Sequence, residues 1–345
     1  MRIAAYLHYY PPLRYVGGEL ASAEFFEHLV GVGHKVDVYA KFVSTPYTRR
    51  GVRVMNSGFL GPVVARDYDL FVTHPEIRTE AMRLADQRVP YVAIVHNTSA
   101  ETLRSLERQA PDLTFANSEW TASKIPTSVE NVHVVRPLSF RREYGHPPGE
   151  YVTMINLSVE KGVGMFSQLA QRHPLYNFIG VKGGYRTQTE ARELPPNVLV
   201  LEHTPNIEVA YRKTKVLLVP SLAEAYGMVV AEAMQYGIPV IASDLPGIRE
   251  VGGDAPIYCA PEDYPAWSQS LDLLMGDPIE WAARSLRSTE RGTYLYQRSR
   301  ADLDTLITEM RRAGDRCACG LVTGADECQI PCGLSARTSR ATDGL

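Results

Sequence analysis

Short apolar runs of strand length alternate with amphipathic helical patterns along most of this chain, and this alternation constrains the fold more than any other feature. It is typical of parallel sheets covered by helices, because a parallel strand pair needs a crossover connection, usually a helix. In the first half the strand candidates are Arg2–Leu7, Lys35–Ala40, Leu70–Val72, Tyr91–Val95, Leu113–Ala116 and Val132–Val135. Between the first two, Glu19–Val32 has the broad apolar face of a helix. The chain therefore begins as a β-α-β unit.

A polar segment rich in Pro and Gly, Arg136–Tyr151, interrupts the alternation and indicates an interdomain linker. The pattern then resumes. Strands are predicted at Val152–Leu157, Asn177–Val181, Val198–Leu201, Lys215–Val219 and Pro239–Ala242, and helices at Gly162–Arg172, Ile207–Lys213, Gly227–Tyr236, Tyr264–Leu274 and Asp302–Arg312. The second half is therefore predicted to be another helix-covered parallel sheet.

The length of 345 residues suits two domains of ordinary size. We predict an α/β protein with two Rossmann-like, doubly wound domains, residues 1–145 and 146–312, and a tail over residues 313–345. The final helix of the second domain is expected to pack back on the first. Sheets of this type bind ligands at the carboxyl ends of their strands, so two of them facing each other define one cleft.

Composition narrows the range of partners. Hydrophobic residues make up 45% of the chain and charged residues 22%, which is ordinary for a globular protein. A net charge of −3 gives no indication of a nucleic-acid surface. The N-terminal apolar run is too short for a signal peptide, and no run of about 20 apolar residues follows. We therefore expect a cytoplasmic protein without a membrane span.

The most informative motif lies in PSLAEAYGMVVAEAMQYGIPV, which places Glu224 in a loop after a buried strand and Glu232 in the following helix. Gly227 allows the chain to turn, and the helix begins at about Met228. Unpaired N–H groups and the helix dipole at such a start favour an anion, such as a diphosphate. A carboxylate is suited to accept hydrogen bonds from vicinal hydroxyls of a ribose or a sugar.

Glu224 and Glu232, with seven residues between them in this context, resemble the E-x7-E motif of retaining glycosyltransferases of family 4. The resemblance implies the GT-B architecture, a nucleotide-diphosphate sugar as donor (UDP- or GDP-sugar), retention of the anomeric configuration, and no metal or other cofactor for catalysis. It assigns Glu224 to catalysis. It also assigns Tyr226, Gly227, Met228 and Glu232 to the donor.

Two N-terminal segments agree with this family. YVGGELASAEFF resembles its Gly-Gly loop and first helix, and the missing side chains of Gly17 and Gly18 would let a diphosphate approach the backbone. YVAIVHNTS places His96 at the end of a buried strand, where the family has a histidine that contacts the donor sugar or the reacting centre. A structural histidine is the alternative for His96.

At the start of the second half, MINLSVEKGVGMF resembles the strand, Glu-Lys-Gly loop and helix of the family. The resemblance gives Lys161 a catalytic role at the leaving diphosphate, whose developing charge it would stabilise. Asn156 stands where the family usually has an arginine, and it remains a candidate for donor binding. Lys182 and Arg186 are then candidates for the second cation.

The predicted function is transfer of a sugar from a nucleotide donor to a hydroxyl acceptor. A GT-B epimerase or phosphorylase and a catalytically silent nucleotide-sugar-binding subunit are the alternatives. The acceptor, a small molecule or saccharide by default and a hydroxylated DNA base as the other possibility, is expected to meet the loops His8–Val16 and Val43–Arg53. Arg49, Arg50 and Arg53 are candidates for contact with phosphate.

The tail carries four of the five cysteines of the chain: Cys317, Cys319, Cys328 and Cys332. Clustered thiols in a cytoplasmic chain favour metal binding over disulfides. A structural Zn²⁺ is one hypothesis. A tail that binds no metal is the other, because the C-x-C and C-x3-C spacings differ from the usual C-x2-C pairs.

Overall fold

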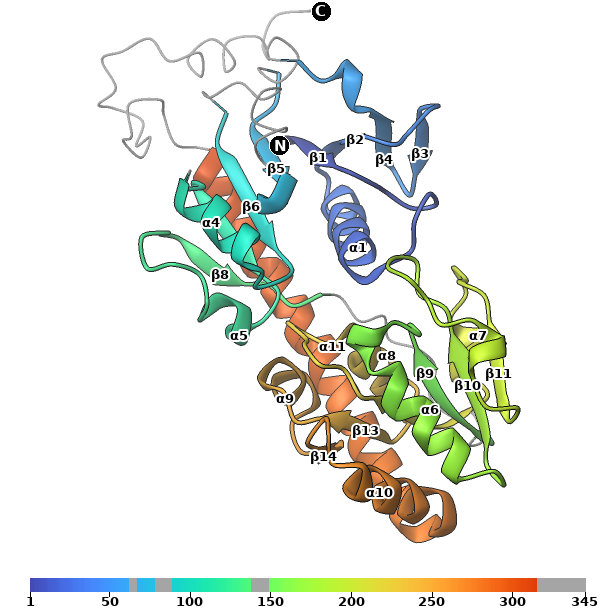
Figure 1. Cartoon of the computed structure of the whole chain (residues 1–345). Coiled ribbons are helices and arrows are strands. Elements are labelled where there is room, and N and C mark those ends of the chain that lie inside the picture. Colours follow the sequence, from blue (N-terminus) through green and yellow to red (C-terminus); the bar gives the residue numbers. More distant parts are fainter. Residues whose placement is uncertain (62–66, 78–88, 109, 138–148, 315–345) are drawn as a thin grey trace, which may run out of the picture.

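The computed structural model describes residues 1–61, 67–77, 89–108, 110–137 and 149–314. They form two helix-covered sheets, one in each half of the chain, and the long helix α11 runs along both (Figure 1). The two helix-covered sheets agree with the predicted α/β class of two doubly wound domains. Because the carboxyl ends of parallel strands lie at one edge of each sheet, the loops at these edges are where a ligand site is expected.

The N-terminal sheet has eight strands in the order β3-β4-β2-β1-β5-β6-β7-β8. Among the strands of the described residues, only β3 is antiparallel to its neighbour in this sheet. The strand bounds are β1 Arg2–Leu7, β2 Lys35–Ala40, β3 Tyr47–Arg49, β4 Val52–Asn56, β5 Leu70–Thr73, β6 Tyr91–Val95, β7 Leu113–Ala116 and β8 Val132–Val134. The strand order reverses between β1 and β5, and the carboxyl ends beside such a switch point are the usual place for a ligand.

The C-terminal sheet has six parallel strands in the order β11-β10-β9-β12-β13-β14. Their bounds are β9 Tyr151–Ile155, β10 Asn177–Val181, β11 Val198–Leu201, β12 Thr214–Val219, β13 Val240–Ser243 and β14 Ile257–Cys259. The order reverses between β9 and β12. The loops after these two strands therefore adjoin the second switch point.

Helices cover both sheets. Their bounds are α1 Gly17–Gly31, α4 Ala100–Arg108, α5 Glu119–Ala122, α6 Val163–Arg172, α7 Glu208–Tyr211, α8 Met228–Gln235, α9 Pro246–Gly252, α10 Tyr264–Gly276 and α11 Pro278–Gly314. Short 3-10 turns occur at η1 Ser57–Phe59, η2 Pro75–Ile77, η3 Val159–Lys161 and η4 Ala191–Glu193. Side chains alternate along β1 between two cores, with Ile3 in the core beneath α1 and Tyr6 in the core on the other face.

The 37-residue helix α11 joins the two halves (Figure 1). Leu295 lies in a core of the C-terminal sheet, whereas Leu303, Leu306 and Met310 pack under the N-terminal sheet with α1. The sequence pattern had predicted only the second part of this helix, Asp302–Arg312. Its first part is mostly polar, and three of its four buried positions are Ser288, Gly292 and Ser299, so its apolar periodicity is weak.

Two other sequence expectations differ from the structure. The strand predicted to reach Leu157 ends at Ile155, because Asn156 adopts a left-handed backbone with φ of 74°. The segment Val43–Arg53, expected to be an acceptor loop, contains β3, a tight turn at Arg50 and Gly51, and the start of β4. Both central turn residues have positive φ, which matches a two-residue hairpin turn.

Candidate active site

The starts of helices α1 and α8 lie against each other across the two halves. A Cβ added to Gly17, the first residue of α1, would lie 3.5 Å from Cγ of Met228, the first residue of α8. Neither helix start has a side-chain cap hydrogen bond. Their backbone N–H groups and helix dipoles therefore favour an anion at this junction.

The loops after β9 and β12, at the switch point of the C-terminal sheet, carry an ion pair. Lys161 Nζ donates to Glu224 Oε1, which also accepts from Ser221 Oγ at 3.1 Å. Gly162 has a φ of 84°, and a Cβ there would lie 1.9 Å from the Pro220 carbonyl oxygen, so only glycine permits this approach of the two loops. The structure thus brings together the lysine and the glutamate that the sequence had selected.

Gly227 and Tyr226 end the loop that leads into α8. Gly227 has a φ of 91°, a conformation that favours glycine. The Tyr226 ring is 3% exposed and packs in a core of the C-terminal half. A donor would therefore meet the main chain of Tyr226 rather than its ring.

Glu232 lies in the middle of α8, one turn beyond the helix start. Its Oε2 accepts a hydrogen bond of 2.6 Å from Tyr211 Oη, at the end of α7. This contact orients the carboxylate. No sequence signal pointed to Tyr211, because the two residues meet only through packing of α7 against α8.

Asn156 is buried and organises the loop after β10. Its Oδ1 accepts from Gln188 Nε2 at 2.9 Å, and Gln188 Oε1 accepts from the backbone N–H of Gly183 at 2.7 Å. The two candidates for a second cation are paired with carboxylates. Lys182 contacts Glu190 and Glu202 at 2.9 and 3.0 Å, and Arg186 contacts Glu160.

On the N-terminal side, His74 and His96 follow the adjacent strands β5 and β6 and meet beneath α1. Their rings pack edge to face with centroids 4.8 Å apart. Both Nε2 atoms lie within hydrogen-bond distance of Ser22 Oγ, at 3.1 Å for His74 and 3.3 Å for His96. A Cβ on Gly18 would lie 3.7 Å from Cδ2 of His96. The sequence had selected Gly18 and His96 but gave no sign of Ser22 or His74.

Burial keeps both imidazoles uncharged. It lowers the pKa of His96 to about 3, with a further decrease from the neighbouring His74 ring. Burial likewise lowers the pKa of His74 to about 4, with a smaller contribution from His8. At neutral pH each ring therefore carries one proton, and neither is a cation that would attract a phosphate.

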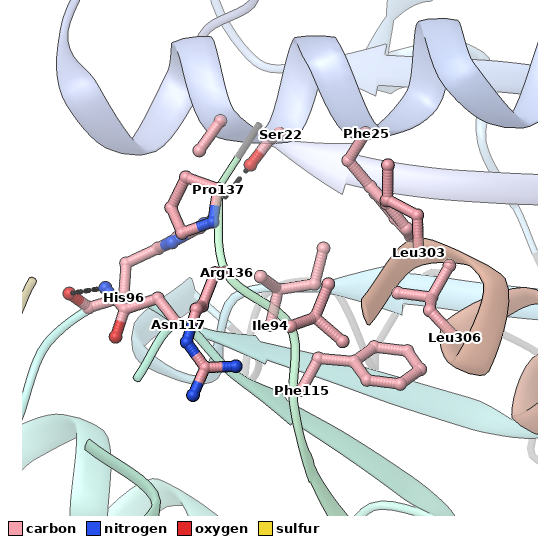
Figure 2. Close-up of a pocket in the computed structure, with 12 residues that line it drawn as sticks. Ser22, Phe25, Ile94, His96, Phe115, Asn117, Arg136, Pro137, Leu303 and Leu306 are labelled. Atoms are coloured by element: carbon pink, nitrogen blue, oxygen red, sulfur yellow. Dashed lines mark hydrogen bonds between the residues drawn. The ribbon is translucent and has the colours of Figure 1, made fainter. Parts of the chain in front are cut away.

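A cavity of about 30 Å³ lies between α1, the ends of β6 and β7, and α11 (Figure 2). Ser22, His96, Asn117 and Arg136 line its polar part, and Phe25, Ile94, Phe115, Leu303 and Leu306 line its apolar part. Asn117 Nδ2 donates to the main-chain oxygen of His96 at 3.1 Å. The volume suits about one water molecule rather than a sugar, so this cavity does not accommodate a substrate.

Arg136, the first residue of the predicted linker, lies at the centre of a partly buried ionic cluster between the halves. It contacts Asp302 of α11 at 2.8 Å, Glu119 of α5 at 3.1 Å and Glu250 of α9 at 3.5 Å. The Glu250 carboxylate also accepts from the backbone N–H groups of Glu119 and Trp120 at 2.8 Å. Sequence analysis did not select these residues, because isolated charges in distant segments carry no pattern.

Ser118 makes a second contact between the halves. It caps α5, where its Oγ accepts from Thr121 N. It also donates to the main-chain oxygen of Ala225 at 2.9 Å, directly beside Glu224. The arginines expected to meet phosphate have protein partners instead: Arg49 and Arg50 pair with Glu27, and Arg53 with Asp37.

Within the described ranges, no group of three or more His, Cys, Asp or Glu side chains is arranged to hold a metal ion. Cys317, Cys319, Cys328 and Cys332 lie outside the described residues, so the zinc hypothesis stays a prediction. No helix in the described part of the chain is long and apolar enough to cross a membrane.

Two sheets with facing switch points, joined by a long helix, define the class: an α/β protein with the GT-B fold. Residues 154–291 match the family described as "Glycosyl transferases group 1". This match covers the part of the chain that holds Lys161, Glu224 and Glu232. It does not extend to the N-terminal sheet.

Sequence relatives match in short segments. The chain is 28% identical over 120 residues to the O-antigen biosynthesis glycosyltransferase WclY of Escherichia coli, which is 33% of this chain and 34% of that protein. It is 34% identical over 65 residues to the O-antigen chain mannosyltransferase RfbU of Salmonella typhimurium, covering 19% of this chain and 18% of that protein. The chain thus matches about a third or less of the length of these relatives.

Solved structures match over nearly the whole chain. A sucrose-phosphate synthase from Thermosynechococcus elongatus superposes with a TM-score of 0.75 at 15% identity, covering 90% of this chain and 98% of that one. HepE of Anabaena, solved in complex with UDP-glucose, has a TM-score of 0.72 at 17% identity and covers 89% and 99% of the two chains. At this level of identity the likeness establishes the fold.

Proposed function

We propose that this chain is a retaining glycosyltransferase of family 4 that moves a sugar from a UDP- or GDP-sugar to a hydroxyl acceptor. The observation that carries the proposal is the meeting of two uncapped helix starts, at Gly17 and Met228, in a fold whose β9 and β12 loops hold the Lys161–Glu224 pair. Support comes from the family matched by residues 154–291 and from the relatives named as glycosyltransferases.

The proposed roles follow from the chemistry of each group. Lys161 and the N–H groups of both helix starts stabilise the negative charge on the leaving diphosphate. Glu232 accepts hydrogen bonds from the donor ribose, and Glu224 and His96 hold the sugar. Residues 1–145 bind the acceptor and residues 146–312 bind the donor.

In the proposed reaction the bond between the anomeric carbon and the diphosphate oxygen breaks, and a bond to the acceptor oxygen forms on the same face. The acceptor proton passes to the departing diphosphate. Attack on that face accounts for retention without a covalent enzyme intermediate. Because the helix starts and Lys161 supply the positive potential, the reaction needs no divalent metal.

A thermal-shift panel of UDP, GDP and ADP tests the donor site directly. A ligand at about 100 times its Kd stabilises the folded state by about 2.7 kcal/mol, so one nucleotide is expected to raise the melting temperature clearly above the others. HepE, solved with UDP-glucose, makes the UDP-sugar the first donor to try. No stabilisation by any nucleoside diphosphate would contradict the proposal.

Product analysis separates the alternatives. A transferase releases free nucleotide from the donor and forms a glycoside whose anomeric configuration, read by NMR, matches that of the donor. An epimerase instead changes the sugar while it remains on the nucleotide, a phosphorylase forms a sugar phosphate, and a silent subunit binds without turnover. An inverted product, or activity lost in EDTA and restored by Mg²⁺ or Mn²⁺, would refute the proposed mechanism.

A further inference from the structure

Ser22, in the second turn of α1, has more polar partners than its single proton can serve as donor. Its Oγ lies 2.9 Å from the main-chain oxygen of Gly18, 3.1 Å from His74 Nε2 and 3.3 Å from His96 Nε2. The side chain is 1% exposed, so solvent does not compete for these contacts. The three contacts together determine where the protons lie.

The carbonyl of Gly18 is only an acceptor, so the short contact between two oxygens requires the Ser22 proton to point at it. The hydroxyl then has only lone pairs left for the two imidazoles. Each imidazole must therefore donate, and each must carry its proton on Nε2. A neutral imidazole with its proton on Nε2 has an unprotonated Nδ1.

We infer that Ser22 is a positioning residue that fixes His96 as the Nε2–H tautomer, so that the ring offers a bound sugar only the lone pair of Nδ1. This inference deepens the proposed function and depends on it for the identity of the ligand. His96 is then a hydrogen-bond acceptor for a hydroxyl of the donor sugar. It does not donate a proton in the reaction.

The orientation of the ring agrees with this role. Gly18 faces the Cδ2 edge of His96, and Nε2 points to Ser22, so the side of the ring that carries Nδ1 is directed away from α1. Figure 2 shows Ser22 and His96 pointing toward each other from α1 and the end of β6. Across the described residues Nδ1 has no protein hydrogen-bond partner, and the His96 side chain is only partly buried.

His74 completes the arrangement from the neighbouring strand. Its edge-to-face packing on His96 restricts rotation of that ring, and its own Nε2–H occupies the second lone pair of Ser22. With both lone pairs and the proton in use, the hydroxyl has no capacity left to accept from a flipped His96. The tautomer and the ring orientation are therefore set together.

The test is ¹⁵N NMR of the histidine side chains in the intact protein, since the shifts of the two ring nitrogens identify the tautomer without substrate. Comparison with His96→Gln assigns the signals. The wild-type protein is expected to show His96 protonated on Nε2. A proton on Nδ1, or fast exchange between the two tautomers, would overturn the inference whether or not the protein is a transferase.

Binding then tests the consequence for the ligand. Ser22→Ala is expected to mix the tautomers and to weaken binding of the nucleotide sugar about two- to tenfold, the value of one hydrogen bond, with binding of the nucleoside diphosphate unchanged. Ser22→Thr keeps the hydroxyl and should retain both the single His96 tautomer and the wild-type affinity for the nucleotide sugar. Ser270→Ala is the matched control, because Ser270 also donates to the carbonyl four residues earlier but lies on α10, away from the histidines.

Two results separate the failure of this inference from the failure of the proposed function. Equal weakening of nucleotide sugar and nucleoside diphosphate by Ser22→Ala would mean a general structural effect and would overturn the inference. A protein that binds no nucleoside diphosphate but has His96 as the Nε2–H tautomer would refute the donor site and retain the positioning role of Ser22.

Discussion

The two sheets present different chemistry at their switch points. In the C-terminal half the loops after β9 and β12 hold an ion pair, Lys161 with Glu224. In the N-terminal half the corresponding region holds Ser22, His74 and His96, which share hydrogen bonds and carry no charge at neutral pH. The comparison teaches that two similar sheets carry different groups at corresponding edges: under the proposed function, Lys161 meets the diphosphate of the donor and His96 meets the hydroxyls of its sugar.

The largest effect on stability is expected at Arg136, where the two halves of the chain are joined. Arg136→Ala should lower the free energy of unfolding by about 3–5 kcal/mol, because it leaves the carboxylates of Asp302 and Glu250 without their buried partner. Chemical denaturation followed by circular dichroism measures it. Arg298→Ala, which removes a half-exposed arginine 3.5 Å from the same Asp302, is the control and should cost much less. A similar cost for the two variants would show that the halves are held together by other contacts.

The ion pair at the edge of the C-terminal sheet is tested by Lys161→Ala. Loss of this cation should lower turnover about 100- to 1,000-fold, as for removal of a group that stabilises developing negative charge, with a smaller effect on KM. Lys182→Ala is the comparison, because Lys182 follows the neighbouring strand β10 but pairs with Glu190 and Glu202. If Lys182→Ala reduced turnover and Lys161→Ala did not, the role would belong to the β10 loop.

Glu232→Ala tests whether donor binding and turnover depend on different residues of the C-terminal half. It should weaken binding of both the nucleotide sugar and the nucleoside diphosphate by about 10- to 100-fold, since hydrogen bonds to a charged group contribute about 1.5–3 kcal/mol. Isothermal titration calorimetry measures this loss. Tyr211→Phe removes only the hydroxyl that donates to the Glu232 carboxylate and is expected to have a smaller effect. Unchanged affinity in Glu232→Ala would remove this residue from the donor site.

The neutral group of Ser22, His74 and His96 is tested by the pH dependence of the free energy of unfolding. The pKa values of His96 and His74 are lowered in the folded state to about 3 and about 4, below the usual 6.5 of the unfolded chain. The unfolded chain therefore binds more protons between these values, and the free energy of unfolding should fall as pH drops from about 6.5 toward 4. In the double variant His74→Gln, His96→Gln this slope should be shallower. An identical pH profile in the variant would mean that the rings are not kept neutral by the fold.

Much of the fold could be predicted because each buried parallel strand is a continuous apolar run in the sequence. Arg2–Leu7, Lys35–Ala40, Tyr91–Val95 and Asn177–Val181 have the same bounds in the structure as in the sequence analysis. The hairpin of β3 and β4 was not predicted. It lies at the edge of the sheet, where only part of each strand is buried, so its alternation is weak.

The residues of the candidate site also fall into those that the sequence predicts and those that it does not. Glu224, Glu232 and Lys161 belong to continuous motifs, and the structure places Lys161 beside Glu224 as an ion pair. Ser22 and His74 were not recognised, because a serine on a helix and a histidine after a strand are common and neither has a local pattern. Asn156 illustrates a third situation: its place in the motif was visible, but only its contact with Gln188 shows that it organises a loop.

By itself the sequence determined most of the buried strands and many of the helices that cover them, since burial on two faces requires apolar runs and a covering helix requires an apolar stripe. It also determined which candidate site residues, such as Lys161, Glu224 and His96, follow the carboxyl ends of strands. Only the tertiary structure decided which of those edges meet. The contacts of Gly17 with Met228, of Ser22 with both histidines and of Arg136 with three carboxylates each join segments far apart in the chain. Such contacts depend on the packing of whole elements, and no local stretch of sequence encodes that packing.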